Sequence, residues 1–415
     1  MKKYENYKDS GLEWLGMVPE HWEILPFKRG VSVNNGRDYK HVKSEDGYPV
    51  IGSGGQFAYA SDYLYDGEVI LLGRKGTIDK PRYFSGKFWT VDTMFYAIPN
   101  QKCIAKYMYY QALTIPFSFY STDTALPSMT QSDLGNHLMC FPPISEQRII
   151  ASYLDQKVGQ IDALISEKEK MVEDLKAYRS SLITETVTKG LDKEVEMKDS
   201  GVEWIRRIPS TWKSSKIGRI YSDIGSGTTP DSNNNLYYKE DGFNWLQTGD
   251  LTDGYITETS RHISQLAIDE KHMRFYPVDS IVVAMYGATI GKVGFLKIET
   301  STNQACCVLP PSENMDAMYM FYMMQASKEI LISNSIGGGQ PNISQSIIKE
   351  HIIPVPPLRI QKEIALYLQN KIGKIVSILS EQEHQLSDLK SYKSSLITEA
   401  VTGKIDLRDW QTKKS

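Results

Sequence analysis

Cysteine is scarce in this chain of 415 residues, and long apolar runs are absent. The four cysteines, Cys103, Cys140, Cys306 and Cys307, form neither a Cys-x-x-Cys pair nor a disulfide framework, which fits a reducing cytosol. The first residues contain no apolar signal-peptide core, and no stretch approaches the roughly 18 apolar residues of a membrane span. We therefore expect a cytoplasmic location, with neither secretion nor a membrane-spanning helix.

A strongly basic region is missing too, since the formal net charge is −3. The balance of Lys and Arg over Asp and Glu is 0 for residues 1–142, −2 for 143–192, −4 for 193–355 and +3 for 356–415. Net charge therefore does not indicate nonspecific attraction to nucleic acid. If DNA is the ligand, local patches or a partner subunit must supply the phosphate contacts.

Motifs for catalysis and cofactor binding are also absent. Phe141–Ile144 and Val355–Leu358 faintly echo the Asn/Asp-Pro-Pro-aromatic motif of amino-methyltransferases, but they lack its polar and aromatic residues. Gly287–Lys292 is one residue short of phosphate-loop spacing, and no Gly-x-Gly-x-x-Gly follows a strand. Gly225–Pro230 indicates a turn rather than a phosphate cradle. These patterns predict no catalytic residue on this chain.

Metal-ligand spacing is likewise missing among the seven histidines, so we expect no metal site. His137 and His351 are equivalent positions, related by the same shift of 214 as the repeat described below. A structural role at the junction of domain and helix is favoured over a catalytic pair.

A segment that occurs twice organises the chain. Residues 142–192 and 356–406 match at 26 of 51 positions at a constant shift of 214. Both begin with Pro-Pro, which suits the first turn of a helix, and neither contains another proline. Apolar residues recur at steps of four and three, with polar gaps at equivalent places (Lys168 and Gln382, Arg179 and Lys393). This spacing predicts two long helices that pair through a coiled-coil seam, and we favour antiparallel pairing.

A second repeat precedes each globular part, as Lys8–Trp22 returns at Lys198–Trp212. The parts between are strand-rich and diverged, with short apolar runs such as Glu68–Leu72 and Ser280–Ala284 and short helices near Ala105–Leu113 and Ala317–Ala326. We predict an α+β fold that is pseudo-twofold duplicated. The expected domains are residues 1–142, a central helix at 143–192, residues 193–355, a C-terminal helix at 356–406 and a tail at 407–415.

This layout resembles the specificity subunit of type I restriction-modification enzymes. The residues that carry the resemblance are Pro142–Gln147 with Ala151 and Leu154, then Leu396–Ile405, and the lead-in Lys8–Trp14. It covers essentially the whole chain and is strongest in the helices. One departure is Arg359-Ile360, where the family usually has Glu at the second position.

The resemblance implies two target-recognition domains that each read one half of a split DNA sequence, with the helices setting the gap. Such a subunit is not an enzyme itself and holds no cofactor. It docks two adenine-N6 methyltransferase subunits that use S-adenosylmethionine, and two restriction subunits that use ATP and Mg can join. The target adenines would be flipped into the partner's pocket.

Candidate DNA-binding residues are the polar side chains on loops that follow the shared strands. Arg and Lys can pair with guanine edges and Gln with adenine, although a phosphate contact or a solvated loop is the commoner role for each alone. The candidates are Arg74, Lys75, Thr77, Lys80, Tyr286, Thr289, Lys292 and Gln340.

Two other classes of protein stay open at this point. One is a self-sufficient methyltransferase or nuclease, against which the missing motifs argue. The other is a coiled-coil scaffold with two protein-binding heads, which would show no sequence-selective DNA binding.

Overall fold

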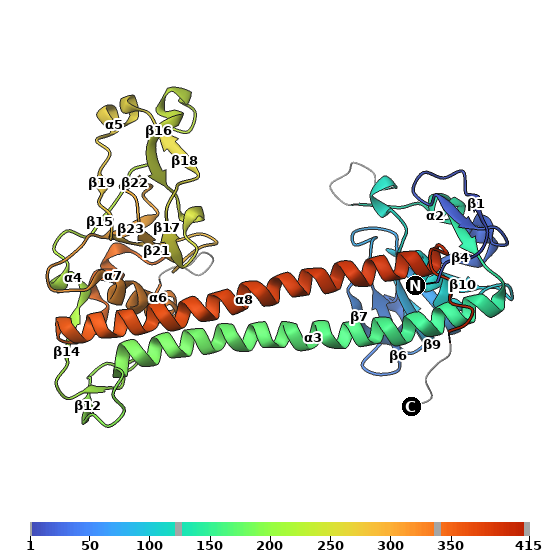
Figure 1. Cartoon of the computed structure of the whole chain (residues 1–415), viewed down its shortest axis with the longest axis horizontal. Helices are drawn as coiled ribbons and strands as arrows, with labels where there is room; N and C mark the ends of the chain where they lie inside the picture. The colour runs from blue at the N-terminus through green and yellow to red at the C-terminus, as the bar shows by residue number, and fades with distance from the viewer. Residues whose placement is uncertain (1, 121–126, 336–341, 411–415) are drawn as a thin grey trace. The chain divides into compact units, whose positions relative to one another are not determined.

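The computed structural model describes residues 2–120, 127–335 and 342–410 of the chain shown in Figure 1. Contacts divide the chain into two compact units. Unit 1 is Met1–Glu169 with His384–Ser415, and unit 2 is Lys170–Glu383. Each unit therefore combines one globular part with a stretch of each long helix. In the described ranges, no helix is long and apolar enough to cross a membrane.

The globular part of unit 1 is built on a seven-stranded sheet in the order β4-β10-β8-β9-β6-β7-β5. Its centre is β8 (Tyr65–Gly73), an apolar strand that pairs antiparallel with β9 (Arg82–Thr90) and β10 (Met94–Pro99). Helix α1 (Ala105–Ala112) packs on these strands in one buried cluster. The other strands of the sheet are β4 (Val31–Asn35), β5 (Lys43–Ser44), β6 (Tyr48–Gly52) and β7 (Gly55–Ala60).

The globular part of unit 2 contains a five-stranded sheet, β15-β23-β20-β21-β17, and a four-stranded sheet, β18-β16-β22-β19. The buried strand β20 (Ile281–Ala284) pairs with β21 (Val293–Leu296) and β23 (Cys306–Leu309), and α6 (Ala317–Ser333) packs on β20 and β21. The remaining elements are β15 (Gly225–Ser226), β16 (Tyr238–Leu246), β17 (Gly254–Ile256), β18 (Arg261–Ile263), α5 (Gln265–Lys271), β19 (Phe275–Tyr276) and β22 (Thr300–Thr302). The predicted α+β class is confirmed in both units.

The junction between globular part and helix repeats in the two units. In unit 1, β3 (Glu23–Pro26) pairs antiparallel with β11 (Leu138–Phe141), and in unit 2 β14 (Lys213–Lys216) pairs with β24 (Ile352–Val355). The short elements around these pairs are the hairpins β1 (Tyr7–Asp9) with β2 (Met17–Pro19) and β12 (Met197–Asp199) with β13 (Arg207–Pro209), and the helices α2 (Gln131–Asn136), α4 (Ile217–Ile220) and α7 (Gln345–Glu350). Five 3-10 turns complete the described parts: η1 (Phe27–Arg29), η2 (Lys40–Val42), η3 (Phe117–Phe119), η4 (Asn235–Tyr237) and η5 (Thr248–Asp250).

The two repeated segments form α3 (Ile144–Lys189) and α8 (Leu358–Val401), drawn green and red in Figure 1. They run antiparallel inside each unit. In unit 1, Lys390 Nζ lies 2.8 Å from Glu169 and Lys393 Nζ lies 2.6 Å from Asp162, so residue numbers rise on one helix as they fall on the other. In unit 2, α3 and α8 are bridged by an ion pair of 3.1 Å between Lys176 and Glu383. The predicted antiparallel pairing is confirmed.

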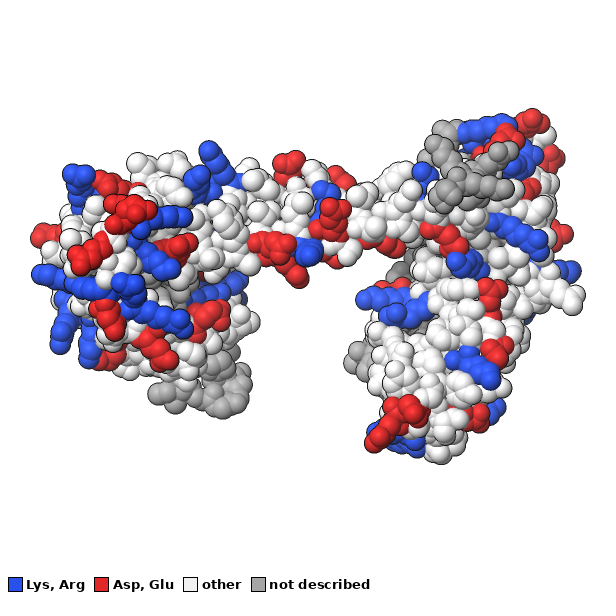
Figure 2. All heavy atoms as spheres, turned by 90° about the horizontal axis from the view of Figure 1, so that it is seen from below, with Lys and Arg blue, Asp and Glu red and all other residues white. Residues whose placement is uncertain are grey.

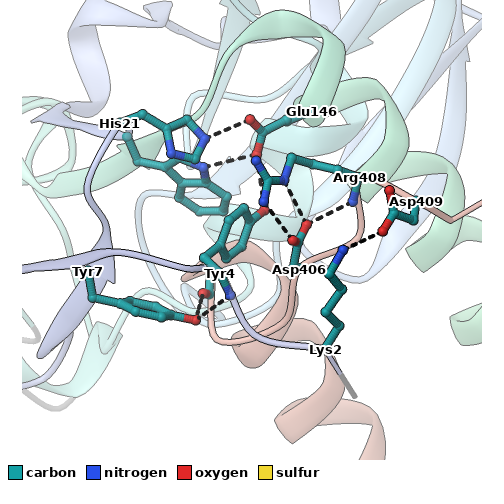
Figure 3. Close-up of polar contacts among 10 residues, drawn as sticks. Lys2, Tyr4, Tyr7, His21, Glu146, Asp406, Arg408 and Asp409 are labelled. Carbon is teal, nitrogen blue, oxygen red and sulfur yellow. Dashed lines mark hydrogen bonds and ion pairs between the residues drawn. The ribbon is translucent and has the colours of Figure 1, made fainter.

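The start of α3 and residues 406–409 meet the segment before and within the lead-in of unit 1 (Figure 3). The buried Glu146 carboxylate accepts hydrogen bonds from Tyr4 Oη (3.0 Å) and Trp22 Nε1 (3.1 Å), and it contacts His21 Nε2 (2.7 Å). Burial next to this carboxylate raises the pKa of Tyr4, so its hydroxyl stays a donor. Ile360 stands at the equivalent position of α8, so unit 2 lacks this carboxylate.

Residues 406–409, after the end of α8, contact the N-terminal segment beside this cluster. Asp406 accepts two side-chain bonds from Arg408, at 3.0 and 2.8 Å, and its backbone N–H donates to Lys2 O at 2.9 Å. The Lys2 ammonium lies 2.5 Å from Asp409. Unit 1 therefore joins segments from opposite parts of the sequence, since Lys2 and Asp409 are 407 positions apart.

The two equivalent histidines hold the lead-in hairpins. Trp14 stacks on His137 and Trp204 stacks on His351, with ring centroids 5.3 Å apart in both units. His137 Nδ1 also lies 2.7 Å from Tyr120 Oη. Burial lowers the pKa of both histidines to about 4. These contacts agree with the structural role favoured from the sequence.

The buried histidines should make the chain less stable in mild acid. A histidine that titrates near 4 in the fold and near 6.5 when unfolded binds more protons unfolded, so its stabilisation is present above pH 6.5 and is lost as the pH falls toward 4. We expect a loss on the order of 1–3 kcal/mol per histidine across this window. Urea unfolding at pH 7.5, 6 and 5 measures it. A His137→Phe/His351→Phe variant, which keeps an aromatic ring, should have a flatter profile. An equally steep profile in that variant would contradict the assignment.

Candidate nucleic-acid interface

In unit 1, three predicted site residues lie on the turn after β8. The backbone N–H groups of Arg74 and Lys75 both donate to Thr93 O, at 2.8 and 3.2 Å. On its other side the turn pairs with the segment before α2, since Met129 N donates to Arg74 O at 3.0 Å and Gly76 N donates to Pro127 O at 2.9 Å. The turn is thus held between two neighbouring segments, and a held turn presents side chains in defined positions.

The side chains of this turn differ in how far they are fixed. The half-buried Arg74 guanidinium lies 5.9 Å from the centre of the Phe95 ring and donates to Asp92 O at 3.3 Å. Lys75 and Thr77 are exposed. Arg74 is therefore oriented by its own domain, whereas Lys75 and Thr77 are available to a ligand.

Lys80 lies beside a cavity of about 570 Å³ instead. Arg82 and Lys106 line the same cavity, and Lys106 pairs with Asp155 of α3 at 2.5 Å. The Arg82 Nε atom is buried without a hydrogen-bond partner, while Arg82 Nη2 donates to Ser53 O at 3.3 Å. Lys80 thus belongs to a separate basic group near the junction of α1 and α3.

In unit 2, the equivalent turn between β20 and β21 carries Tyr286, Thr289 and Lys292. Lys292 N donates to Thr289 O at 2.9 Å, and Ala284 N donates to Lys292 O at 2.9 Å, so the turn is tight. Gly287, with a φ of 84°, supplies the left-handed conformation that the turn requires. Tyr286 is exposed, and Thr289 and Lys292 are half-buried.

The unit 2 turn is held as its counterpart is in unit 1. Met285 N donates to Ala305 O at 2.8 Å, and Ile343 N donates to Met285 O at 2.7 Å. Both units therefore place the turn after the central strand between the same two neighbours. The remaining predicted residue, Gln340, lies outside the described residues.

Each unit has a second tight turn, at Gly36 in unit 1 and at Gly227 in unit 2, which the sequence alone did not reveal. A Cβ added to Gly36 would lie 2.0 Å from Val91 O, and one added to Gly227 would lie 1.6 Å from Thr302 O. Only glycine fits either position. The exposed Arg37 follows Gly36, with its N–H bonded to Thr90 O at 2.9 Å and its carbonyl bonded to Trp89 Nε1 at 2.9 Å. Arg37 is a further candidate for contact with a ligand.

Figure 2 shows Lys and Arg side chains interspersed with Asp and Glu over the face it displays, so the charge on that face is mixed. Within the described ranges, no group of three or more His, Cys, Asp or Glu side chains could hold a metal ion. The turns thus offer hydrogen-bond donors, isolated cations and an exposed aromatic ring. These groups can contact base edges, which differ with the sequence, and phosphates, which do not.

Comparison with known proteins gives concordant matches. The model of the family described as type I restriction modification DNA specificity domain matches twice, at residues 22–174 and 209–387. The type I restriction enzyme EcoBI specificity subunit of Escherichia coli is 21% identical over 435 residues, covering 96% of this chain and 89% of that protein. The MjaIX specificity subunit of Methanocaldococcus jannaschii is 29% identical over 180 residues, covering 42% of this chain and 40% of that protein.

The fold has a solved counterpart as well. A chain solved in work on complex assembly and conformational transition of the type I R-M system matches with a TM-score of 0.70 and 16% identity. The match covers 94% of this chain and 99% of that one. At this identity the likeness concerns the fold alone, and it extends over both units.

Proposed function

Because this chain belongs to the type I restriction-modification DNA specificity family, we propose that it is the subunit that selects a split DNA target and positions the catalytic subunits there. The observation that carries the proposal is the duplication itself. Two units share one plan, and each presents a held turn after its central strand, while the side chains on the two turns differ. Two different readers on one repeated scaffold suit a target with two different halves.

Direct contact with bases is assigned to the turns. Lys75 and Thr77 of unit 1 and Tyr286 of unit 2 are exposed there, and Arg37 lies on the neighbouring turn of unit 1. Arginine and lysine favour guanine edges in the major groove. Lys80 at the unit 1 cavity is exposed and suits a phosphate contact, which positions a duplex without reading it.

Catalysis belongs to partner subunits in this proposal. Two adenine-N6 methyltransferase subunits carry S-adenosylmethionine, and restriction subunits that use ATP and Mg join the same complex. The duplicated scaffold supports two methyltransferase subunits for each copy of this chain. A flipped adenine would enter the pocket of the partner while this chain holds the flanking duplex.

The isolated chain should show no methyl transfer and no DNA cleavage. Incubation with S-adenosylmethionine and DNA should give background incorporation of methyl groups, because the sequence contains no motif for that chemistry. Adding the cognate methyltransferase should restore methylation, with a maximum near two methyltransferase subunits per chain. The same methyltransferase without this chain is the control and should be inactive. Methyl transfer by the purified chain alone would contradict the proposal.

A further inference from the structure

Segment 90–93 of unit 1 connects the two turns that carry Arg37 and Arg74. The backbone N–H groups of these two arginines donate to the carbonyl groups at its two ends, at 2.9 and 2.8 Å. Between these ends lies Val91, whose Cγ2 atom would be 4.0 Å from a Cβ added to Gly52 at the end of β6. The hairpin of β6 and β7 therefore adjoins both turns to which base contacts are assigned.

A β-bulge in this hairpin sets the direction of Phe57. The register of β6 and β7 passes from Val50 paired with Ala58 to Ile51 paired with Gln56, so Phe57 is an extra residue without a partner on β6. An extra residue of this kind changes the direction in which a strand presents its side chain. Phe57 is 55% exposed, which is a large exposure for an aromatic ring.

The exposed ring is nevertheless held in place. Tyr39 meets it edge to face, with ring centroids 5.3 Å apart. A Cβ added to Gly52 would lie 3.2 Å from Phe57 Cε1, so the ring lies against the backbone of that glycine. Arg82 Nη2 holds the turn of the same hairpin by donating to Ser53 O at 3.3 Å. A side chain that is already ordered loses little conformational entropy when it binds.

We propose that Phe57 contacts the C5-methyl group of a thymine in the half-site that unit 1 reads, and so distinguishes thymine from the other bases at that position. This inference rests on the proposed function, under which the neighbouring turns read base edges in the major groove. The groups on those edges are hydrogen-bond donors and acceptors, and the thymine methyl is the apolar one. It is the group that an apolar ring beside these turns can recognise.

The other role open to an exposed aromatic ring is insertion between two base pairs. Side chains that insert in this way enter from the minor groove and kink the duplex. Phe57 adjoins turns whose Lys and Arg side chains suit guanine edges in the major groove, and Tyr39 and Gly52 cover part of its ring. These contacts favour a ring that lies against base edges.

The test measures how tightly the complex of the full chain with its methyltransferase binds target DNA. The half-site of unit 1 is the half that changes when residues 23–141 are exchanged. Each thymine of that half, on either strand, is replaced in turn by deoxyuridine, which removes the methyl group and leaves every hydrogen-bonding group in place. The wild-type complex should bind about fourfold more weakly at one of these positions, the value of one buried methyl group.

Substitutions of Phe57 should remove this difference selectively. Phe57→Ala should bind the thymine and deoxyuridine sites equally, and Phe57→Leu, which keeps an apolar side chain, should retain part of the difference. Phe243→Ala is the matched control, because Phe243 is an exposed phenylalanine (46%) of unit 2 and should leave the full difference. Both positions are exposed, so the thermal unfolding midpoints should stay close to that of the wild type.

Three results would overturn this inference and leave the proposed function standing. One is a wild type that binds its target selectively but responds to deoxyuridine at no position of this half. Another is a Phe57→Ala variant that keeps the wild-type difference. The third is a Phe57→Ala variant that binds more weakly although the wild type ignores the methyl groups, as an inserted ring would give. A complex without target-selective binding would overturn the proposed function and this inference with it.

Discussion

Replacing residues 23–141 with the equivalent segment of another specificity subunit is expected to change one half of the DNA target and leave the other half intact. The boundaries follow from the strand pairing, because Glu23 at the start of β3 is the register partner of Phe141 at the end of β11. The segment thus enters and leaves the scaffold at one point. The equivalent pair in unit 2 is Lys213 with Val355, so residues 213–355 can be exchanged in the same way.

Hydrogen bonds between the exchanged segment and the long helices determine which replacement segments should fold correctly. Tyr107 Oη and Gln111 Nε2 in α1 donate to Val401 O, at 3.3 and 2.9 Å, and thereby attach the globular part to the end of α8. Tyr319 Oη makes the matching bond to Val187 O in unit 2, at 2.9 Å. Donor segments that keep a tyrosine at this place should fold on the scaffold.

Methylation of the original site should then fall by about 1,000-fold or more, since a replaced half-site presents several mismatches at once. The new site should combine the donor's half with the unchanged half, and the reciprocal exchange of 213–355 is the control. Simultaneous change of both half-sites in a single exchange would contradict independent readers.

Lengthening both long helices should lengthen the spacer between the half-sites without changing the bases read. The insertion points are between residues 172 and 173 in α3 and between 386 and 387 in α8, which face each other because Glu169 pairs with Lys390 and Lys176 pairs with Glu383. Four residues in each helix add roughly 6 Å, or nearly two base pairs. Two base pairs also rotate the far half-site by about 70°, and the seam shifts by half a residue, so activity should drop.

A seven-residue insertion at the same points is the better-matched variant. It adds about 10.5 Å, or about three base pairs, and keeps the heptad register of the seam. Methylation mapping of cells expressing either variant with the methyltransferase measures the spacer. An active variant that keeps its old spacer, or that reads new bases, would show that the helices do not set the distance.

The helices could be predicted from the sequence because their signal is local and repeated. Ile150, Leu154, Val158 and Ile161 are all buried, as the spacing requires. The polar residues that interrupt the apolar seam have hydrogen-bond partners that the spacing could not predict. Lys168 donates to Gln385 at 2.6 Å, and Arg179 reaches Asp253 O and Gln325 at 3.5 and 3.4 Å, so each gap meets a polar neighbour.

The candidate site was predictable in part. The turns with Arg74, Lys75 and Thr77 and with Tyr286, Thr289 and Lys292 could be found because each follows an apolar strand. The different location of Lys80, away from Arg74, Lys75 and Thr77, could not be predicted, since the cavity beside it is formed with residues of α1 and α3. Arg37 was missed because the constraint on Gly36 comes from Val91, which is distant in the sequence. The roles of these residues as base readers stay predictions.

Contacts between segments that are far apart in the sequence could not be predicted from it. Glu146 bonds to Tyr4 and Trp22, and Asp406 bonds to the backbone of Lys2, across separations that no periodicity reports. Ile360 departs from the family pattern at the position that Glu146 occupies in α3. It removes from unit 2 the carboxylate on which the cluster of unit 1 is built.

Mapping methylated adenines in the DNA of cells that express this chain with its cognate methyltransferase measures directly whether the chain selects a split DNA target. We expect one target with two short specified halves, an unspecified spacer of fixed length and one methylated adenine in each half. An exchange of residues 23–141 should alter only one half. A continuous target, a variable spacer, or a methylation pattern that is the same without this chain would contradict the proposed function.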